Sequence, residues 1–192
     1  RRDHVSALRE ITVGLIGEHI SRTRLPAALD ILCAEYGYRL NFELIDSANR
    51  IAFDFRATVD EVRSWGWTGV SVTHPFKISA AAYAAKGMVA AAAHLGSANT
   101  LTFGGAVKGY NTDYTGFVSA WRHCMGDAEP GRVAMAGAGG VAAALAPAVL
   151  ELGATDLAIW DLDPARATAL IARLDGRARS IPASETIAAT RN

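Results

Sequence analysis

The stretch from Ala134 to Asp163, AMAGAGGVAAALAPAVLELGATDLAIWDLD, constrains the fold more than any other part of this chain. It predicts a short apolar strand, a glycine turn, an alanine-rich helix and a second apolar strand that ends in acidic residues. A strand–helix–strand unit of this kind places its two strands parallel in one sheet. The sequence therefore predicts an α/β fold in which ligands bind at the carboxyl ends of the strands.

The glycine turn has the spacing that binds a dinucleotide pyrophosphate, because Gly137, Gly139 and Ala142 fit the G-x-G-x-x-G/A pattern. The first glycine permits the tight turn, and the second lets the phosphates approach the backbone. Ala142 is small enough for the helix to pack closely on its strand. The start of the helix then offers free N–H donors to the anion. The predicted pyrophosphate-binding residues are Gly137, Ala138, Gly139, Gly140 and Val141.

Asp161 bears on the choice of cofactor. In dinucleotide-binding domains, an acidic residue about 20 residues after the glycine turn hydrogen-bonds the adenosine ribose hydroxyls. Asp161 lies close to this position. NADP carries a phosphate on that ribose, which would meet the carboxylates of Asp161 and Asp163. Arg166 lies one helical turn further on, where it either softens this repulsion or pairs with Asp163 of its own helix. We predict that the cofactor is NAD rather than NADP, with Asp161 and Arg166 among its binding residues.

Composition indicates a soluble globular protein, since 51% of the 192 residues are hydrophobic and 20% are charged. The 19 basic and 19 acidic residues cancel, which argues against a nucleic-acid-binding or membrane-binding surface. No apolar run is long enough to span a bilayer. Cys33 and Cys124 match no metal or redox spacing, so we expect two reduced thiols and no metal site.

We expect a cytoplasmic protein, because the sequence contains no signal peptide. The chain lacks an initiator Met and stops about two strand–helix units beyond the glycine turn. We therefore expect it to be a piece of a longer protein, with the dinucleotide-binding domain incomplete at its C-terminal end.

Strands and helices alternate along the first half of the chain. Strands are predicted at 11–17, 38–46 and 67–74, helices at 25–37 and 57–66, a helix-rich segment broken near Gly87 at 75–96, a hairpin-like pair of strands at 98–113 and an amphipathic helix at 114–126. The polar Pro/Gly segment at 127–131 is the best candidate for a domain boundary. We predict a substrate-binding and catalytic α/β domain at 1–126 and the first part of a Rossmann-type, doubly wound NAD(P)-binding domain at 131–192. An apolar surface on the first domain can support a homodimer.

Three polar clusters follow predicted strands of the first half. They are SRTRLP at 21–26, SVTHPFK at 71–77, and GYNTD at 109–113 with SANT at 97–100 just upstream. Hydroxyl, amide, carboxylate and ammonium groups gathered at strand ends suit a small polyhydroxylated or carboxylated substrate.

Together these clusters resemble the motifs of the shikimate and quinate dehydrogenase family. The family's opening pattern G-x-x-I-x-x-S-x-S-P is matched by Gly17, Ile20, Thr23 and Pro26. Its N-V-T-x-P-x-K appears as SVTHPFK, its A-N-T-L as residues 98–101, and its G-x-N-T-D as GYNTD, followed by the glycine turn. The resemblance covers essentially the whole chain, and four motifs in order are far more specific than one.

The resemblance implies reversible oxidation of a ring alcohol to a ketone by a nicotinamide cofactor, with Lys77 and Asp113 as the catalytic pair. This chemistry suits the residue types, because an ammonium group can stabilise and protonate the oxygen of a ketone that receives a hydride. Asn99 and Thr73 would hold ring hydroxyls of the substrate, and the other predicted substrate-binding residues are Ser21 and Thr23. Thr112 of the GYNTD motif is either part of this site or simply the N-cap of the helix that follows.

The sequence departs from the family pattern at two places in the substrate pocket. Leu25 stands where the family has a Ser or Thr whose hydroxyl helps to bind the substrate carboxylate, and Ser71 replaces an Asn. Thr23 retains the earlier hydroxyl, and Ser21 or a neighbouring arginine can compensate. Shikimate, quinate and related cyclic hydroxy acids therefore all remain open as substrates. The alternatives are a non-catalytic metabolite-binding relative with a regulatory role and a different NAD enzyme, such as one acting on a folate-like substrate.

Overall fold

The computed structural model describes residues 9–186 and 188–190, which belong to two compact units. Of the described residues, the first unit comprises those up to Met88 together with Asn99–Gly109, and the second comprises Val89–Ala98 and those from Tyr110 onward. Residues 110–126, which the sequence-based division assigns to the first domain, thus lie in the second unit. The division into a substrate-binding part at 1–126 and a cofactor-binding part at 131–192 stays a prediction about function.

The first unit is built on a mixed five-stranded sheet of order β2-β1-β3-β4-β5. Strand β1 pairs in parallel with both β2 and β3, whereas β4 runs antiparallel to β3. The strands are β1 Arg9–Gly17, β2 Tyr38–Asp46, β3 Gly69–Val72, β4 Thr100–Thr102 and β5 Lys108–Tyr110. The carboxyl ends of β1, β2 and β3 therefore share one edge of the sheet, and the loops that follow them meet there.

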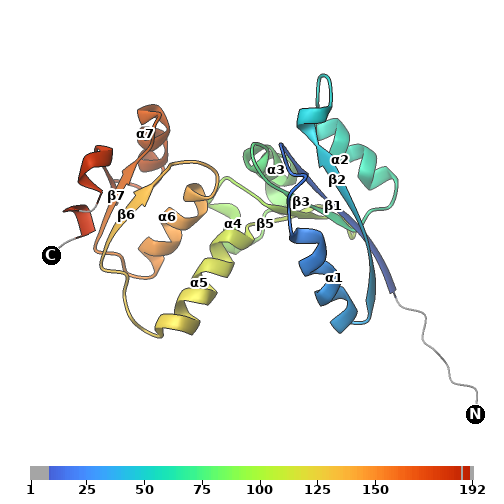
Figure 1. Ribbon diagram of the computed structural model, residues 1–192, viewed down its shortest axis with the longest axis horizontal. Helices are drawn as coiled ribbons and strands as arrows, with labels where there is room; N and C mark the ends of the chain where they lie inside the picture. The colour runs from blue at the N-terminus through green and yellow to red at the C-terminus, as the bar shows by residue number, and fades with distance from the viewer. Residues whose placement is uncertain (1–8, 187, 191–192) are drawn as a thin grey trace, which may run out of the picture. The chain divides into compact units, whose positions relative to one another are not determined.

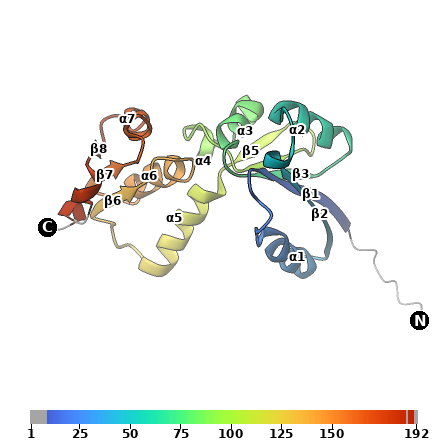
Figure 2. The same cartoon turned by 45° about the horizontal axis from the view of Figure 1, so that its top comes forward.

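Helices cover both faces of this sheet. Figure 2 shows α1 on one face and α2 and α3 on the other. Their bounds are α1 Leu25–Glu35, α2 Phe55–Ser64 and α3 Lys77–Ala84. Apolar side chains of the strands and of α2 fill the core, including Leu15, Ile16, Ile45, Val59, Val62, Val70, Val72 and Leu101.

Most of the predicted elements agree with the structure to within a few residues. Helix α2 begins earlier than predicted because the side chain of Asp54 caps it by accepting a 2.9 Å hydrogen bond from the Ala57 N–H. The break predicted near Gly87 lies in the 3-10 helix Ala85–Gly87. A Cβ on Gly87 would collide with the backbone carbonyl of Val107, so this position requires glycine.

The second unit contains a three-stranded parallel sheet of order β6-β7-β8, of which Figure 1 labels β6 and β7 and Figure 2 also labels β8. Its elements are α4 Ala90–Ala93, α5 Thr112–Met125, β6 Arg132–Ala136, α6 Ala142–Glu151, β7 Asp156–Trp160, α7 Pro164–Ala172 and β8 Arg179–Ser180. Further 3-10 helices lie at Ser47–Asn49, Ala183–Glu185 and Ala188–Thr190. The small side chains on α6 pack with Leu157 and Ile159 of β7 and with Leu170 of α7 in one apolar core.

These two α/β units confirm the predicted fold class, in which an N-terminal α/β domain precedes a Rossmann-type parallel unit. The predicted order of strand, glycine turn, helix and strand corresponds to β6, the turn, α6 and β7. Within the described ranges, no helix is long and apolar enough to cross a membrane.

Candidate functional site: a dinucleotide-binding turn and a cluster of polar loops

The glycine turn joins β6 to α6 and contains a glycine in the left-handed region of backbone conformation. Gly137 has a φ of +95°, which a residue with a side chain rarely adopts. Its N–H donates a 2.8 Å hydrogen bond to the carbonyl of Trp160 at the end of β7. A Cβ built on Gly139 would meet no heavy atom within 4 Å, so the space beside this residue is open. The turn therefore leaves room for a phosphate close to its backbone.

Asp161 lies directly beside this turn. One oxygen of its carboxylate accepts a 2.7 Å hydrogen bond from the Ala138 N–H, and the other accepts a 2.8 Å bond from the Asp163 N–H. These backbone N–H groups, that of Ala138 foremost, hold the pKa of Asp161 below its ordinary value. Each carboxylate oxygen has a second lone pair, so Asp161 can still accept hydrogen bonds from ribose hydroxyls.

Arg166 pairs with Asp163 on the first turn of α7. The Asp163 side chain caps this helix through a 3.0 Å bond from the Ala165 N–H, and the guanidinium of Arg166 lies 3.7 Å from the same carboxylate. Both side chains are more than half exposed. Arg166 therefore balances the charge of Asp163, one of the two arrangements that the sequence left open.

A pocket of about 450 Å³ adjoins Asp161 on the side of β8. Its walls combine apolar side chains with polar groups and are formed by Trp160, Asp161, Leu162, Pro164, Ala167, Ser180, Ile181, Pro182 and Ala183. The Trp160 indole Nε1 is buried and has no hydrogen-bond partner among the residues that the structure describes. The size and apolar walls of the pocket suit a flat ring of nucleobase dimensions.

In the first unit, the loops after β1 and β3 are bonded to each other at the carboxyl edge of the sheet. The Thr73 N–H donates to the Ile16 carbonyl at 2.9 Å, and the Glu18 N–H donates to the His74 carbonyl at 3.0 Å. The Thr73 methyl group lies against Gly17, where a Cβ would collide with it. The structure thus brings two of the predicted polar clusters together.

Lys77 and Asn99 belong to the same edge. Lys77 is the first residue of α3 and is only 8% exposed, an unusual burial for lysine. The Asn99 carbonyl accepts a 2.7 Å bond from the Val72 N–H at the end of β3. The Asn99 side chain accepts a 3.1 Å bond from the Thr100 hydroxyl. Asn99 is therefore bonded to the end of β3, and the buried Lys77 begins α3, the next helix along the chain.

The loop after β1 holds the remaining predicted substrate-binding residues. The Thr23 hydroxyl accepts a 3.2 Å bond from the Leu25 N–H, which leaves its own proton for a ligand. Ser21 is exposed, and Leu25 begins α1 as a half-buried residue. Ser71, the second departure from the family pattern, lies on β3 opposite Leu15 of β1 and Thr100 of β4.

Sequence reasoning missed Asp46, which ends β2 and shapes the loop after β1. Its carboxylate accepts hydrogen bonds of 3.0 Å from the N–H groups of His19, Ile20 and Ala48. Desolvation raises the pKa of Asp46, but these N–H groups outweigh it and bring the pKa below its ordinary value. An acid at the end of a predicted strand is the only sequence signal that could have pointed to this role.

Asn111, rather than Thr112, is the N-cap of α5, so the sequence interpretation of Thr112 as the cap is wrong. The Asn111 side chain accepts a 3.3 Å bond from the Tyr114 N–H. Its Nδ2 donates to the carbonyl and the hydroxyl of Ser97 at 3.1 and 2.9 Å. Asn111 and Ser97 are almost fully buried. Asn111 therefore ties the SANT segment to the first turn of the helix that carries Asp113.

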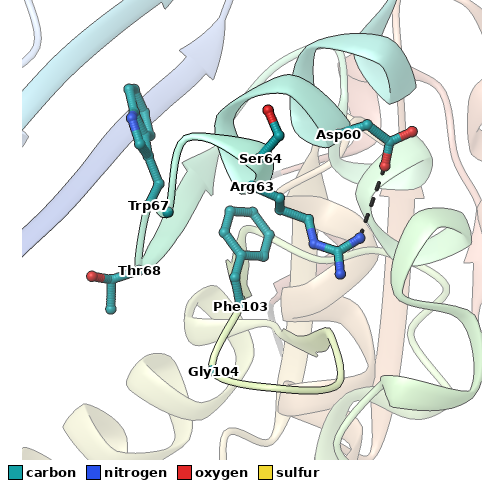
Figure 3. A pocket seen from close by; sticks show the side chains of 8 residues that line it. Asp60, Arg63, Ser64, Trp67, Thr68, Phe103 and Gly104 are labelled. Carbon is teal, nitrogen blue, oxygen red and sulfur yellow. Dashed lines mark ion pairs between the residues drawn. The ribbon is translucent and has the colours of Figure 1, made fainter.

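A second pocket, of about 610 Å³, lies at the opposite end of β3 (Figure 3). It is lined by Asp60, Arg63, Ser64, Gly66, Trp67, Thr68, Phe103 and Gly104. The Arg63 guanidinium lies 3.9 Å from Asp60, donates to the Tyr83 hydroxyl at 2.9 Å and sits over the Phe103 ring. The charged groups of this pocket thus partner each other, and the pocket is separate from the polar loops. In the described part of the chain, no cluster of His, Cys, Asp and Glu is arranged to hold a metal ion.

Comparison with known proteins gives consistent results. Residues 15–101 match the family described as the shikimate dehydrogenase substrate binding domain. The chain is 37% identical over 164 residues to quinate/shikimate dehydrogenase (NAD(+)) of Corynebacterium efficiens, covering 83% of this chain and 57% of that protein. It is also 37% identical over 175 residues to shikimate dehydrogenase (NADP(+)) of Streptomyces avermitilis, covering 86% and 60%. The chain therefore spans about three fifths of the curated relatives that it matches.

Solved structures agree with these sequence relatives. Quinate dehydrogenase from Corynebacterium glutamicum in complex with NAD superposes with a TM-score of 0.81 at 27% identity, covering 90% of this chain and 64% of that chain. Shikimate 5-dehydrogenase from Thermus thermophilus in complex with NADP(H) and shikimate gives a TM-score of 0.75 at 26% identity, covering 91% and 64%. Family motifs, fold and relatives agree, and the chain belongs to the shikimate/quinate dehydrogenase family.

Proposed function

We propose that this chain is part of a nicotinamide-dependent oxidoreductase that interconverts a ring hydroxyl and a ketone on a cyclic hydroxy acid. The observation that carries the proposal is that both kinds of site occur in one chain. The second unit has a glycine turn with the spacing of a dinucleotide-binding motif, and Asp161 is bonded to it. The first unit has polar loops bonded together beside the buried Lys77.

The residues around the glycine turn fit a dinucleotide. The open space at Gly139 suits the pyrophosphate, together with the backbone N–H groups of residues 139–141 just before α6, since those of Gly137 and Ala138 already donate to Trp160 and Asp161. Asp161 would accept hydrogen bonds from the ribose hydroxyls, and the pocket beside it suits the adenine ring. When bound, the nicotinamide group supplies the hydride acceptor or donor.

NAD is favoured over NADP on electrostatic grounds. A phosphate on the adenosine ribose would approach the ionised Asp161, whose pKa is lowered, and the nearby Asp163. Arg166 is already paired with Asp163, so it offers less compensation to an added phosphate. Relatives of similar identity include proteins named for NAD and for NADP, so this preference rests on these residues.

Lys77 and Asp113 are proposed as the catalytic pair. The Lys77 ammonium would hold the reacting oxygen, stabilise its negative charge and exchange its proton. Asp113, on the first turn of α5, would keep the ammonium charged and take part in proton transfer. Thr73, Asn99, Thr23 and Ser21 would bind the ring hydroxyls and the carboxylate. The proposed substrate class comprises shikimate, quinate and related cyclic hydroxy acids. We also propose that the protein is cytoplasmic and forms a homodimer.

The proposal is tested with full-length protein by following reduction of NAD and, separately, NADP in the presence of shikimate, quinate and related hydroxy acids. Reduction of NAD with one of these acids is the expected result, and the panel then identifies the substrate. Binding of a hydroxy acid and NAD without turnover would favour the non-catalytic, regulatory alternative. Absence of both binding and turnover would reject the proposed substrate class.

A further inference from the structure

The pocket of about 610 Å³ at the start of β3 takes no part in the proposed function. It lies between the second half of α2 and the turn that joins β4 to β5 (Figure 3). The polar loops that carry Thr73 and Lys77 follow the opposite end of β3. A strand of four residues spans roughly 13 Å, so a small ligand in this pocket would not overlap the proposed substrate site.

Two opposite charges lie side by side in this pocket. Asp60 and Arg63 are three residues apart on one face of α2, with the guanidinium 3.9 Å from Asp60 Oδ1, and both side chains are more than a third exposed. The Tyr83 hydroxyl donates to the same Asp60 oxygen at 2.5 Å and accepts a 2.9 Å bond from Arg63 Nη1. These bonds use one carboxylate oxygen and one guanidinium N–H, so both groups retain the capacity to bind a ligand.

The surrounding aromatic rings hold Arg63 in place. Its guanidinium lies 6.0 Å from the centroid of the Tyr83 ring and 5.8 Å from that of the Phe103 ring. Because these contacts and the bond to Tyr83 already restrict the side chain, less conformational entropy is lost when a ligand binds to it. An exposed ion pair contributes little to stability by itself, so sharing its charges with a ligand costs the protein little.

The pocket also has an apolar wall. Figure 3 shows the ring of the half-buried Phe103 beside the Arg63 guanidinium. Trp67, which is almost fully buried, borders the same space. A Cβ built on Gly66 or on Gly104 would meet no heavy atom within 4 Å, so the space beside both residues is open. An apolar ring can therefore pack on Phe103 in this pocket.

We propose that this pocket binds a small zwitterion with an apolar side chain, the chemistry of a free α-amino acid. The carboxylate of the ligand would accept hydrogen bonds from Arg63, and its ammonium group would donate to Asp60. The Ser64 hydroxyl, one helical turn after Asp60, donates to the Glu61 carbonyl at 2.7 Å, so its oxygen can accept from the same ammonium group. A ligand with only a carboxylate would be repelled by Asp60, and one with only an ammonium group by Arg63, so the paired charges select a zwitterion.

Analogues of one ligand test the role of the two charges. In an NMR titration of the full chain into the millimolar range, L-phenylalanine should bind at one site. 3-Phenylpropanoate, which lacks the ammonium group, and phenethylamine, which lacks the carboxylate, should each bind at least roughly tenfold more weakly, because each leaves one charge of the pocket unmatched. No binding of L-phenylalanine, or equally tight binding of 3-phenylpropanoate, would overturn the proposal.

Matched variants test the position of the site. Arg63→Met retains the apolar stem of the side chain and Asp60→Asn retains its shape, and each should weaken binding of L-phenylalanine at least roughly tenfold. Arg56→Met and Glu61→Gln are the controls, because both residues are exposed on α2 and neither borders the pocket. Arg56 also lies over the Tyr83 ring, at 5.2 Å, so it matches Arg63 in its packing. Normal binding by Arg63→Met, or an equal loss in the controls, would contradict the assignment.

Competition separates this pocket from the proposed substrate site. An excess of shikimate or quinate should leave the binding of L-phenylalanine unchanged, since the two sites lie at opposite ends of β3. Displacement of L-phenylalanine would mean that it occupies the substrate site and would refute the proposal. Binding is measured directly in each of these experiments, so the result does not depend on whether the proposed catalytic function is correct.

Discussion

The two candidate binding regions of this protein are held together over very different distances along the chain. The glycine turn, Asp161 and α7 belong to one strand–helix–strand segment, joined by bonds such as that from the Ala138 N–H to Asp161. The polar loops of the first unit are joined by bonds between segments that other elements separate, such as Glu18 to His74 and Ile20 to Asp46. A contiguous motif therefore forms the first region, whereas the order of strands in a sheet assembles the second.

The largest expected effect concerns the first unit. Lys77→Ala should lower turnover of the hydroxy acid by at least roughly a hundredfold, the usual contribution of a general acid or base. The dissociation constant of NAD, measured by fluorescence titration, should not change. Lys86→Ala, which alters an exposed lysine of the same unit, is the control. Turnover close to the wild-type value would show that Lys77 is not catalytic.

The next largest effect concerns Asn111, which links two segments of the second unit. Asn111→Ala should lower the free energy of unfolding by about 2–4 kcal/mol, since it removes a helix cap and leaves the Ser97 carbonyl buried without its donor. Asn111→Asp retains a good cap but cannot donate, so it should also be destabilised in urea unfolding. Asn49→Ala, at an exposed position, is the control. An Asp variant as stable as the wild type would mean that only the cap matters.

A smaller effect is expected for the contiguous region. Asp161→Ala should weaken NAD binding about tenfold, because a charged ribose partner is lost. NADP binding should improve relative to NAD, since a negative charge is also removed. Fluorescence titration with both cofactors measures the ratio, and Asp127→Ala in an exposed loop is the control. An unchanged ratio would refute the electrostatic argument for NAD.

The smallest effect tests whether Asp46 acts only through the loop that it shapes. Asp46→Asn should raise the KM for the hydroxy acid by roughly threefold, because a neutral acceptor binds N–H groups less strongly than a carboxylate. The value of kcat and the affinity for NAD should change little. A fall in kcat with an unchanged KM would contradict this positioning role.

The pH dependence of stability follows from the same residue. The pKa of Asp46 is lowered in the folded state, so its contribution to stability is fully present above the ordinary carboxyl pKa of about 3.9. That contribution is lost as the pH falls through the lower, folded pKa. The difference in stability between wild type and Asp46→Asn should therefore shrink in acid unfolding experiments.

The sequence predicted the second unit's candidate site more completely than the first. The positions of the glycine turn and of Asp161 follow from spacing within one segment, and the structure places Asp161 beside the turn, while its binding of the ribose stays a prediction. The pairing of Arg166 with Asp163 was one of two arrangements left open. Asp46 was missed because its role depends on β2 lying beside β1, and Asn111 was missed because its partner Ser97 is buried with it.

By itself, the sequence determined the α/β fold class, the position of the glycine turn between a strand and a helix, and the family. Each of these depends on local periodicity, glycine spacing or ordered motifs, which are properties of short segments. Only the tertiary structure decided which loops are bonded together, that Asn111 rather than Thr112 caps α5, and that the antiparallel β4 makes the first sheet mixed. The physical reason is that hydrogen bonds between loops, burial and strand order arise only when distant segments pack against each other.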